Sequence, residues 1–352
     1  MTGLYIAVAI LIFGLLIAIH ELGHFTAAKL CGVRVTEFAI GLGPAILKSK
    51  KGETQYSLRC IPFGGFCAME GEDENSSDPR AFTNQKPWKR LIILVAGSFM
   101  NFLLGFVIVL ILYSSADYFR APVIDSFFPG CPYESADGLQ TGDRFIRIDG
   151  RRIWQSDDVA EALSRGGEEH DIVLRRDGKR VKLEGYHFVP IEYEGYDRKM
   201  YGFSFGVDRA NLGNTVRYSW NTSMQFVRLV WDGLGQLVHG KVSVNDLSGP
   251  VGIVDMMAET GAQAESVKMG LYDIFFFGAF IAVNLAVMNM LPIPALDGGR
   301  VFLLIVSAII EGITRKKLDP KYEGYIHAAG MILLLALMAY VMLHDIIKIA
   351  TR

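Results

Sequence analysis

The chain has 352 residues, 51% of them hydrophobic, and its positive mean hydropathy favours a polytopic membrane protein over a soluble one. The formal net charge is −2, so the sequence lacks the basic field of a nucleic-acid-binding protein, and nucleic acid is excluded as the main partner. The four cysteines form no Cys-x-x-Cys pattern, which argues against a disulfide framework and against a cysteine zinc site.

The chain begins with an apolar run, Leu4 to Ile19, that contains no charged residue. We expect a first membrane-spanning helix from about Leu4 to near Leu30, ending before Gly32. Because the segment lacks a basic start and an obvious small-residue cleavage site, it is predicted to be a retained helix rather than a removed signal peptide.

His20-Glu21-Leu22-Gly23-His24 stands at the inner end of this run. On a helix the two histidines lie one turn apart on the same face, where two imidazoles can hold one zinc ion, and Glu21 can act on zinc-bound water. The alternative is a chance pattern with capping or interfacial histidines. Ionisable groups in a hydrophobic span cost a few kcal/mol and are rarely kept without function. The motif therefore predicts a metalloprotease centre inside a bilayer, with a third ligand supplied from elsewhere.

Residues 33–90 form a loop rich in lysine and arginine, which predicts a cytoplasmic loop and an extracytoplasmic N-terminus. Within it, Val35–Pro44 and Thr54–Ile61 are predicted strands joined across a turn at Lys48–Gly52. Four glycines permit tight bends there: Gly41, Gly43, Gly64 and Gly65. A plain structural hairpin and an edge that captures an extended substrate by strand addition agree equally well with this spacing.

Leu91–Tyr113 is the second predicted span, and it carries one polar amide, Asn101. A hydrogen bond from Asn101 to a neighbouring helix is favoured over a place in an active-site cavity. From 114 to 207 the composition becomes that of a soluble domain. The predicted elements of this domain are a short helix at 134–139, a strand at 144–148, a helix at 157–164 and a hairpin of 171–176 with 180–184.

This order of elements resembles a PDZ domain of the form found in bacterial proteases. The matching positions are Leu139, Gly142, Asp143 and Asp149-Gly150. The resemblance implies one PDZ domain, which binds a chain end or an extended segment, or acts as a size filter. Pro132 removes a backbone donor from the loop that usually binds a carboxylate, which argues against capture of a C-terminus.

The third predicted span, Ile274–Leu291, ends at Pro292 and Pro294, which break the helix and free backbone groups that hydrocarbon cannot satisfy. This segment must therefore face protein or a water-filled cavity. Asp297 follows at that depth. It either pairs with a base such as Arg300 or supplies the third ligand, an oxygen, that a metal held by only two histidines still needs.

The segments around this third span are less distinctive. Asn211–Gly240 has the aromatic pattern of a membrane interface or of a helix packed on protein, and Val242–Ile253 is expected to be a loop. After a helical Val301–Ile310 and a basic loop, Ile326–Leu343 is the fourth predicted span, which leaves the C-terminus extracytoplasmic. His344-Asp345 is expected to be an interfacial anchor.

The helical His20-Glu-Leu-Gly-His24 motif and the later Asn289-x-x-Pro-x-Pro-x-Leu-Asp297-Gly motif together resemble the site-2 protease family of intramembrane zinc metalloproteases. The single PDZ domain and the Leu247–Ile253 loop make the chain similar to the bacterial regulator-of-sigma-E type. Two features depart from the family pattern: Gly97 lacks the proline that often follows it, and the better-known Gram-negative members carry two PDZ domains.

The resemblance implies Zn²⁺ as the cofactor. It implies His20, His24 and Asp297 as metal ligands, Glu21 as the general base and Asn289 as a catalytic residue that contacts the substrate or the oxyanion. The further substrate contacts that it implies are Gly41, Gly43, Pro292 and Pro294.

The predicted fold is a multi-pass α-helical membrane protein with about four membrane-spanning helices, a cytoplasmic-side β-hairpin region and an inserted extracytoplasmic PDZ domain of α+β type. Its predicted parts are residues 1–113, 114–207, 208–272 and 273–352. The implied function is cleavage of single-span membrane proteins within the bilayer, with anti-sigma factors and remnant signal peptides as substrates, in the bacterial cytoplasmic membrane. The rival hypothesis is a metal transporter or membrane chaperone in which the same residues bind zinc without hydrolysis. Glu21→Gln distinguishes a transporter from a protease, because transport needs no general base.

Overall fold

The computed structural model describes residues 2–72, 76–194, 196–241, 248–314 and 320–350. The chain divides into two compact units. One combines Met1–Leu112 with Ser223–Arg352 and is called the membrane unit here; the other is Tyr113–Thr222, the inserted unit. Residues 208–222 of the predicted linker belong to the inserted unit.

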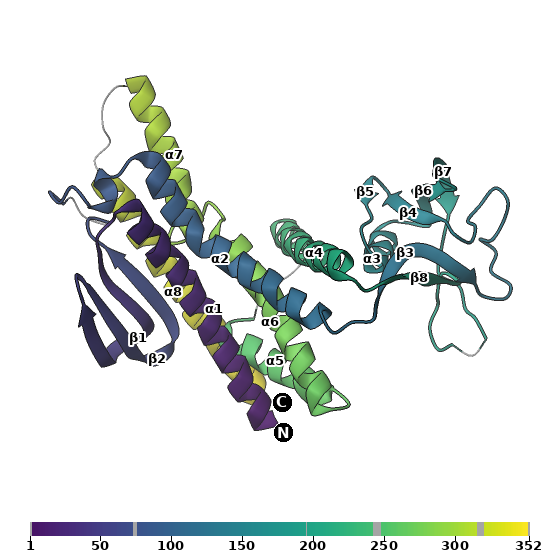
Figure 1. The fold of residues 1–352 in the computed structure, drawn as a ribbon, viewed down its shortest axis with the longest axis horizontal. Helices are drawn as coiled ribbons and strands as arrows, with labels where there is room; N and C mark the ends of the chain where they lie inside the picture. Colours follow the sequence, from purple (N-terminus) through teal and green to yellow (C-terminus); the bar gives the residue numbers. More distant parts are fainter. Residues whose placement is uncertain (1, 73–75, 195, 242–247, 315–319, 351–352) are drawn as a thin grey trace. The chain divides into compact units, whose positions relative to one another are not determined.

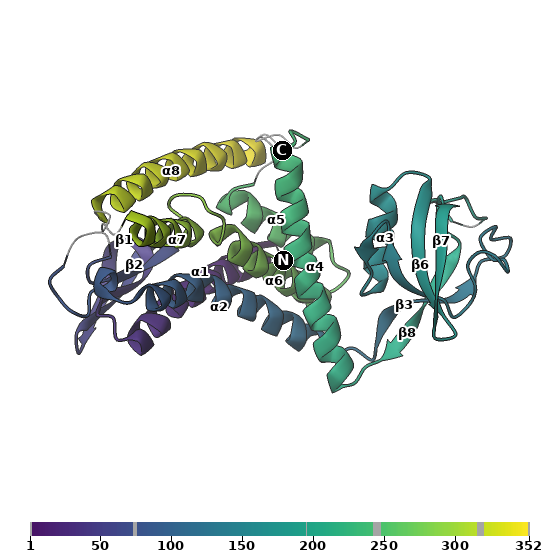
Figure 2. The ribbon, with the colours of Figure 1, turned by 90° about the horizontal axis from the view of Figure 1, so that it is seen from above.

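Four helices of the described chain are long and apolar enough to cross a membrane. They are α1 (Thr2–Cys31), α2 (Pro87–Tyr113), α6 (Val267–Asn289) and α8 (Pro320–Ala350). All four coincide with predicted spans. The bounds of α1 agree to within two residues, whereas α2, α6 and α8 begin four to seven residues earlier than predicted; α6 ends two residues earlier than predicted and α8 seven residues later. Figure 1 shows α1, α2 and α6 in the membrane unit, where α1 packs against α6, and Figure 2 shows α8 beside α7 (Asp297–Thr314).

The core of the membrane unit forms where α1 packs against α6 and α5 (Pro250–Gln263). Tyr5, Ile12 and Leu16 of α1 are buried there with Met257 of α5 and Ile274 of α6. The second half of α4 (Leu212–Val238) joins this unit through the ring of Phe226, which contacts the rings of Phe276 and Phe280 on α6.

The expected loop at Val242–Ile253 is wrong in its second half, while residues 242–247 lie outside the described residues. The chain is already helical at Pro250, because proline suits the first turn of a helix, where its missing N–H would have no partner. Asp345 of α8 caps this start: its Oδ2 accepts the N–H groups of Gly249 at 2.9 Å and Gly252 at 3.0 Å. Asp345 is only 4% exposed, so it acts as a buried cap rather than as the expected interfacial anchor.

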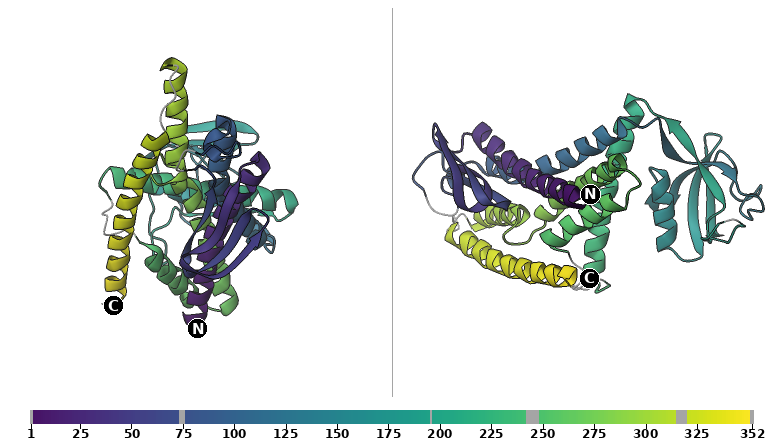
Figure 3. Two further views of the ribbon diagram at one scale, coloured as in Figure 1. Left: turned by 90° about the vertical axis from the view of Figure 1, so that its left-hand side faces the viewer. Right: turned by 90° about the horizontal axis from the view of Figure 1, so that it is seen from below.

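The predicted hairpin is longer than expected and doubles back on itself. β1 (Val35–Lys51) and β2 (Thr54–Met69) are antiparallel and lie beside α1 in Figure 3. The Glu37–Ile40 stretch of β1 pairs with Gln55–Leu58 on one side and with Gly65–Ala68 on the other. The lysines expected in the turn continue the strand, because Lys51 pairs with Thr54.

Within its described residues, the inserted unit contains a six-stranded sheet, the helix α3 and the start of α4. Its strands are β3 (Tyr118–Phe127), β4 (Arg144–Ile148), β5 (Arg151–Arg152), β6 (Glu169–Arg176), β7 (Lys179–His187) and β8 (Phe203–Arg209). The order is β7-β6-β4-β3-β8, with β5 on β4. The helix α3 (Ser156–Arg165) lies against the sheet in Figure 2. It buries Val159, Ala162 and Leu163 in the same core as Phe145 and Leu174.

The short helix expected at 134–139 is wrong. This segment is a turn that returns to itself through a bridge between Glu134 and Leu139, with Leu139 N–H donating to Tyr133 O at 3.0 Å. This turn requires a glycine at position 138, because a side chain there would clash: its Cβ would lie 2.5 Å from Ser135 Oγ. The strand at 144–148, the helix at 157–164 and the hairpin at 171–184 are confirmed to within two or three residues at their ends, while the PDZ identity of the unit stays a prediction.

Candidate active site

Three ligand-type atoms meet where α1 faces the first residue of α7. Nε2 of His20, Nε2 of His24 and Oδ2 of Asp297 lie 3.2 Å from one another in all three pairs. They are the one group of three metal-ligating side chains found within the described residues. The structure therefore brings together the two ends of the chain that carry the two sequence motifs.

This triangle fits a tetrahedral metal ion. For metal–ligand distances of about 2.0 Å, as in zinc sites with nitrogen and oxygen ligands, the edge of a tetrahedron is about 3.3 Å. Within the described residues, the buried Oδ2 of Asp297 accepts no well-formed hydrogen bond, although two histidine nitrogens lie beside it. A buried carboxylate oxygen of this kind requires a positive partner, and a cation at this point supplies one.

The Nδ1 atoms of His20 and His24, which face away from the triangle, contact groups that fix the orientation of the two rings. His24 Nδ1 lies 2.8 Å from the carbonyl oxygen of Ile93, so Nδ1 carries the proton and Nε2 presents a lone pair. His20 Nδ1 lies 3.4 Å from the amide Nδ2 of Asn101, while Asn101 Oδ1 is buried without a partner in the described chain. A half-turn of this amide lets its oxygen accept the Nδ1–H of His20, which leaves Nε2 of His20 free to bind a metal.

Two glycines allow α1 and α2 to approach closely enough for these contacts. A Cβ on Gly23 would lie 2.5 Å from the carbonyl oxygen of Ala96. A Cβ on Gly97 would lie 2.8 Å from Cε1 of both His20 and His24. Gly97 therefore leaves the space that the two imidazoles occupy.

The chain between α6 and α7 is folded tightly under Asp297. Ala295 has a φ of +80°, a left-handed conformation that is costly for a residue with a Cβ, and its N–H donates to His327 Nδ1 at 3.2 Å. A Cβ on Gly298 or Gly299 would collide with the backbone of the preceding turn. The Asp-Gly-Gly sequence thus lets α7 begin directly against this loop, with Asp297 at its first turn.

A cavity of about 410 Å³ opens on the triangle. Of the predicted site residues, His20, Glu21, His24, Asn289 and Asp297 line it; within the described residues, Gly41, Gly43, Pro292 and Pro294 do not. Asn289 places its amide Nδ2 3.4 Å from His20 Nε2. Gly41 faces β2 instead, since a Cβ there would lie 2.7 Å from the carbonyl oxygen of Ile61.

Several residues of the cavity were missed by the sequence analysis. The Phe66–Met69 end of β2 forms one wall, and Glu72 and Arg300 form an ion pair at another. Arg300 was considered as a partner for Asp297, whereas here its carboxylate partner is Glu72. Asn101, expected to bond a neighbouring helix, does so through the ring of a candidate ligand.

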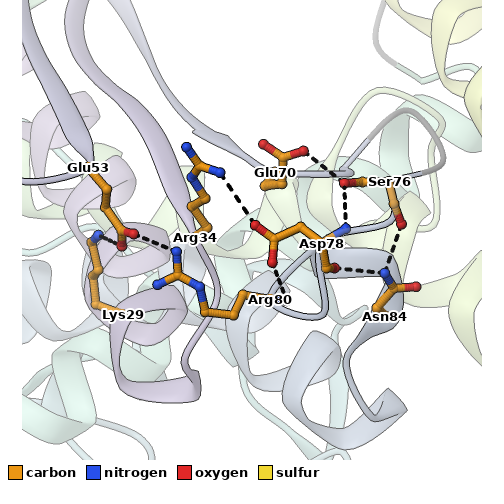
Figure 4. Close-up of polar contacts among 8 residues, drawn as sticks. All are labelled: Lys29, Arg34, Glu53, Glu70, Ser76, Asp78, Arg80 and Asn84. Atoms are coloured by element: carbon orange, nitrogen blue, oxygen red, sulfur yellow. Dashed lines mark hydrogen bonds and ion pairs between the residues drawn. The ribbon is translucent and has the colours of Figure 1, made fainter.

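A polar network holds the segment after β2, on which Glu72 lies (Figure 4). Ser76 Oγ donates to Glu70 at 2.8 Å, and the side-chain amide of Asn84 donates to the backbone oxygens of Ser76 and Asp78. At the hairpin turn, hydrogen bonds from Lys29 and Arg80 lower the pKa of Glu53 to about 2. The network ties the hairpin and the following loop to the end of α1.

An α-helical membrane unit with a His-Glu-x-x-His helix and a converging aspartate is the architecture of an intramembrane metallopeptidase. The chain belongs to peptidase family M50, whose model matches residues 8–337. A chain from Clostridium acetobutylicum that is named as a zinc metalloprotease is 38% identical, with 97% of both chains covered. Zinc metalloprotease RasP of Shouchella clausii is 30% identical, over 97% of this chain and 98% of its own. The regulator of sigma-W protease RasP of Bacillus subtilis is 28% identical, over 96% and 97%.

Proposed function

We propose that this M50 peptidase is a zinc-dependent endopeptidase that cuts membrane-spanning segments of single-span proteins within the bilayer. The observation that carries the proposal is the triangle of His20, His24 and Asp297 donor atoms, 3.2 Å apart, with Glu21 in the same cavity. Two of these ligands lie on a helix long enough to cross a membrane, which supports a reaction at membrane depth. The zinc metalloprotease names of the relatives support zinc as the metal.

In this proposal His20, His24 and Asp297 would hold the metal. A zinc ion bound there supplies Lewis acidity toward water and toward the scissile carbonyl. Glu21 is the general base: it takes a proton from the attacking water and returns it to the leaving amine. The amide of Asn289 donates a hydrogen bond to the carbonyl oxygen as negative charge develops on it.

Substrate binding is assigned to the end of β2 that lines the cavity. A helical substrate must unwind before its peptide bonds are accessible, and an extended segment gains backbone hydrogen bonds by adding beside a strand. Phe66–Ala68 is already paired with β1 on one side and lines the cavity. Gly41 and Gly43, both with positive φ, let β1 bend so that this pairing can form, and Pro292 and Pro294 shape the opposite loop.

The setting proposed for the enzyme is the bacterial cytoplasmic membrane, with β1 and β2 on the cytoplasmic side and the inserted unit and both termini outside. The lysine and arginine bias of residues 33–90 supports this topology. The relative named regulator of sigma-W protease supports membrane-bound anti-sigma factors as one substrate class, beside remnant signal peptides already shortened by another protease. The inserted unit, as a PDZ domain, either binds part of such substrates or excludes long ectodomains.

The test is cleavage of a tagged single-span membrane substrate by the purified full chain, with and without a zinc chelator. We expect zinc-dependent cutting within the span that is lost in Glu21→Gln and kept in Glu265→Gln, which makes the same change at an exposed site between α5 and α6. Stoichiometric zinc without cutting of several ectodomain-shortened substrates would refute the protease. Zinc transport that survives Glu21→Gln would establish the rival.

A further inference from the structure

The inserted unit contains a second cavity, of about 340 Å³, whose chemistry the peptidase reaction does not use. Six of its lining residues are arginines: Arg144, Arg147, Arg152, Arg175, Arg180 and Arg217. Within the described chain, Asp208 is the carboxylate that pairs with these arginines. Its Oδ2 lies 2.5 Å from a guanidinium nitrogen of Arg217, and its Oδ1 lies 3.8 Å from one of Arg144. Six positive charges therefore share one negative charge.

The strand register sets like charges directly opposite one another. Arg144 of β4 is the cross-strand partner of Arg175 of β6, and Arg175 is the partner of Arg180 of β7. Arg147 of β4 is likewise opposite Arg152 of β5. Like charges in directly opposed positions destabilise a sheet. An arrangement of this kind is explained if an anion normally occupies the cavity and neutralises the row.

The cavity lies close to Tyr113, the residue at which the chain enters the inserted unit. Tyr113 is the last residue of the candidate span α2, and its hydroxyl is 3.1 Å from Thr222 Oγ1, which donates to Gln155 Oε1 at 3.4 Å. Asn221 directly precedes Thr222 in the chain, and Trp154 directly precedes Gln155; both Asn221 and Trp154 line the cavity. Two side-chain hydrogen bonds thus connect the end of the span to residues that directly follow two lining residues of the cavity in the chain.

We propose that this cavity binds the phosphate of an anionic phospholipid headgroup from the bilayer that α2 enters. Guanidinium groups match phosphate oxygens with paired hydrogen bonds, which suits a phosphodiester. Trp154, with Arg152 stacked on its ring at 3.9 Å, has the amphipathic character of side chains at membrane interfaces. The position beside Tyr113 favours a lipid over an acidic polypeptide, because the headgroups are always present at that depth.

Binding has a measurable consequence for the sheet. A phosphate between the arginines relieves their repulsion, so β4, β6 and β7 open less often when anionic lipid is present. The energy of one such cross-strand pair corresponds to amide hydrogen exchange that is up to about fivefold slower in these strands.

The experiment is hydrogen–deuterium exchange of the full chain in nanodiscs of phosphatidylcholine, alone or mixed with phosphatidylglycerol. We expect phosphatidylglycerol to slow exchange in β4, β6 and β7 of the unmodified chain. Arg175→Gln, which removes the middle charge of the row, is expected to slow exchange in phosphatidylcholine alone and to abolish most of the response to phosphatidylglycerol. Arg198→Gln, at an exposed site away from the cavity, should behave like the unmodified chain.

Three results would overturn the proposal. The first is equal exchange of the unmodified chain in both lipid mixtures. The second is an undiminished response in Arg175→Gln, which would show non-specific attraction to the surface. The third is protection by poly-glutamate or inorganic phosphate without protection by phosphatidylglycerol, which would assign the cavity to a soluble anion.

Discussion

Replacement of Gly97 by alanine tests the geometry of the metal site without touching a ligand. The added Cβ would lie 2.8 Å from Cε1 of both His20 and His24, and closer still to Nε2 of His24. Normal carbon–carbon contacts are about 3.5–4.0 Å, so the two rings and α2 must separate by several tenths of an ångström or more. The atoms that move are those that converge on Asp297.

Overpacking of this kind costs about 1–3 kcal/mol when the surroundings cannot yield. If this strain is relieved by displacing the imidazoles, it subtracts from the binding energy of the metal. We therefore expect Gly97→Ala to bind zinc about 5- to 150-fold more weakly than the unmodified chain.

The assay is competition for zinc against a chelating fluorophore, with the full chain in detergent. Gly14→Ala is the matched control, because it makes the same substitution in α1 where a Cβ meets nothing within 4 Å. A zinc affinity of Gly97→Ala within twofold of the control would refute the inference that Gly97 makes room for the ligands.

Three further outcomes follow from contacts described above. Asn101→Leu is expected to weaken zinc binding about 10- to 100-fold, because His20 loses the group that fixes the orientation of its ring. Asn101→Asp still offers an acceptor to His20 and should keep most of the affinity. The same zinc competition measures both variants. Asp345→Ala removes the cap of α5 and should lower the free energy of unfolding by about 1–2 kcal/mol, seen as a reduced melting temperature in detergent beside an unchanged His344→Ala. Hydrogen bonds from Lys29 and Arg80 lower the pKa of the Glu53 carboxylate from 4.5 to about 2. The ionised carboxylate therefore stabilises the folded chain above pH 4.5, and this stabilisation is lost as the pH falls toward 2. In acid titrations Glu53→Gln should lose less stability over that window than the unmodified chain.

The parts that sequence predicted are those encoded by local patterns. Four apolar runs predicted four helices, whose ends lie up to seven residues from the expected bounds, and the spacing of His20 and His24 placed both on one helical face. Asp297 became a candidate because two prolines break the helix just before it, and the resemblance to the site-2 protease family implied its role as a ligand. Each of these inferences needs only a dozen neighbouring residues, where periodicity and helix geometry decide the outcome.

The parts that sequence missed depend on contacts across the chain. Phe66–Met69 reaches the cavity because the bulged β1 pairs with two stretches of β2, and a register with such irregularities follows from tertiary packing rather than from alternation. Asn101 reaches a histidine 81 positions away in sequence, which a single polar residue in an apolar helix does not reveal. The pairing of Glu72 with Arg300 likewise joins segments 228 positions apart.

The double pairing of β1 determines where this chain tolerates a change of length. An insertion of one residue between Leu58 and Gly65 would keep the first pairing intact but turn Phe66 and Cys67 to opposite faces, because strand side chains alternate. The same insertion at Gly52, beyond the last paired residues Lys51 and Thr54, alters neither register. Gly52 is therefore the position at which an epitope tag can report on topology with the catalytic wall left in place.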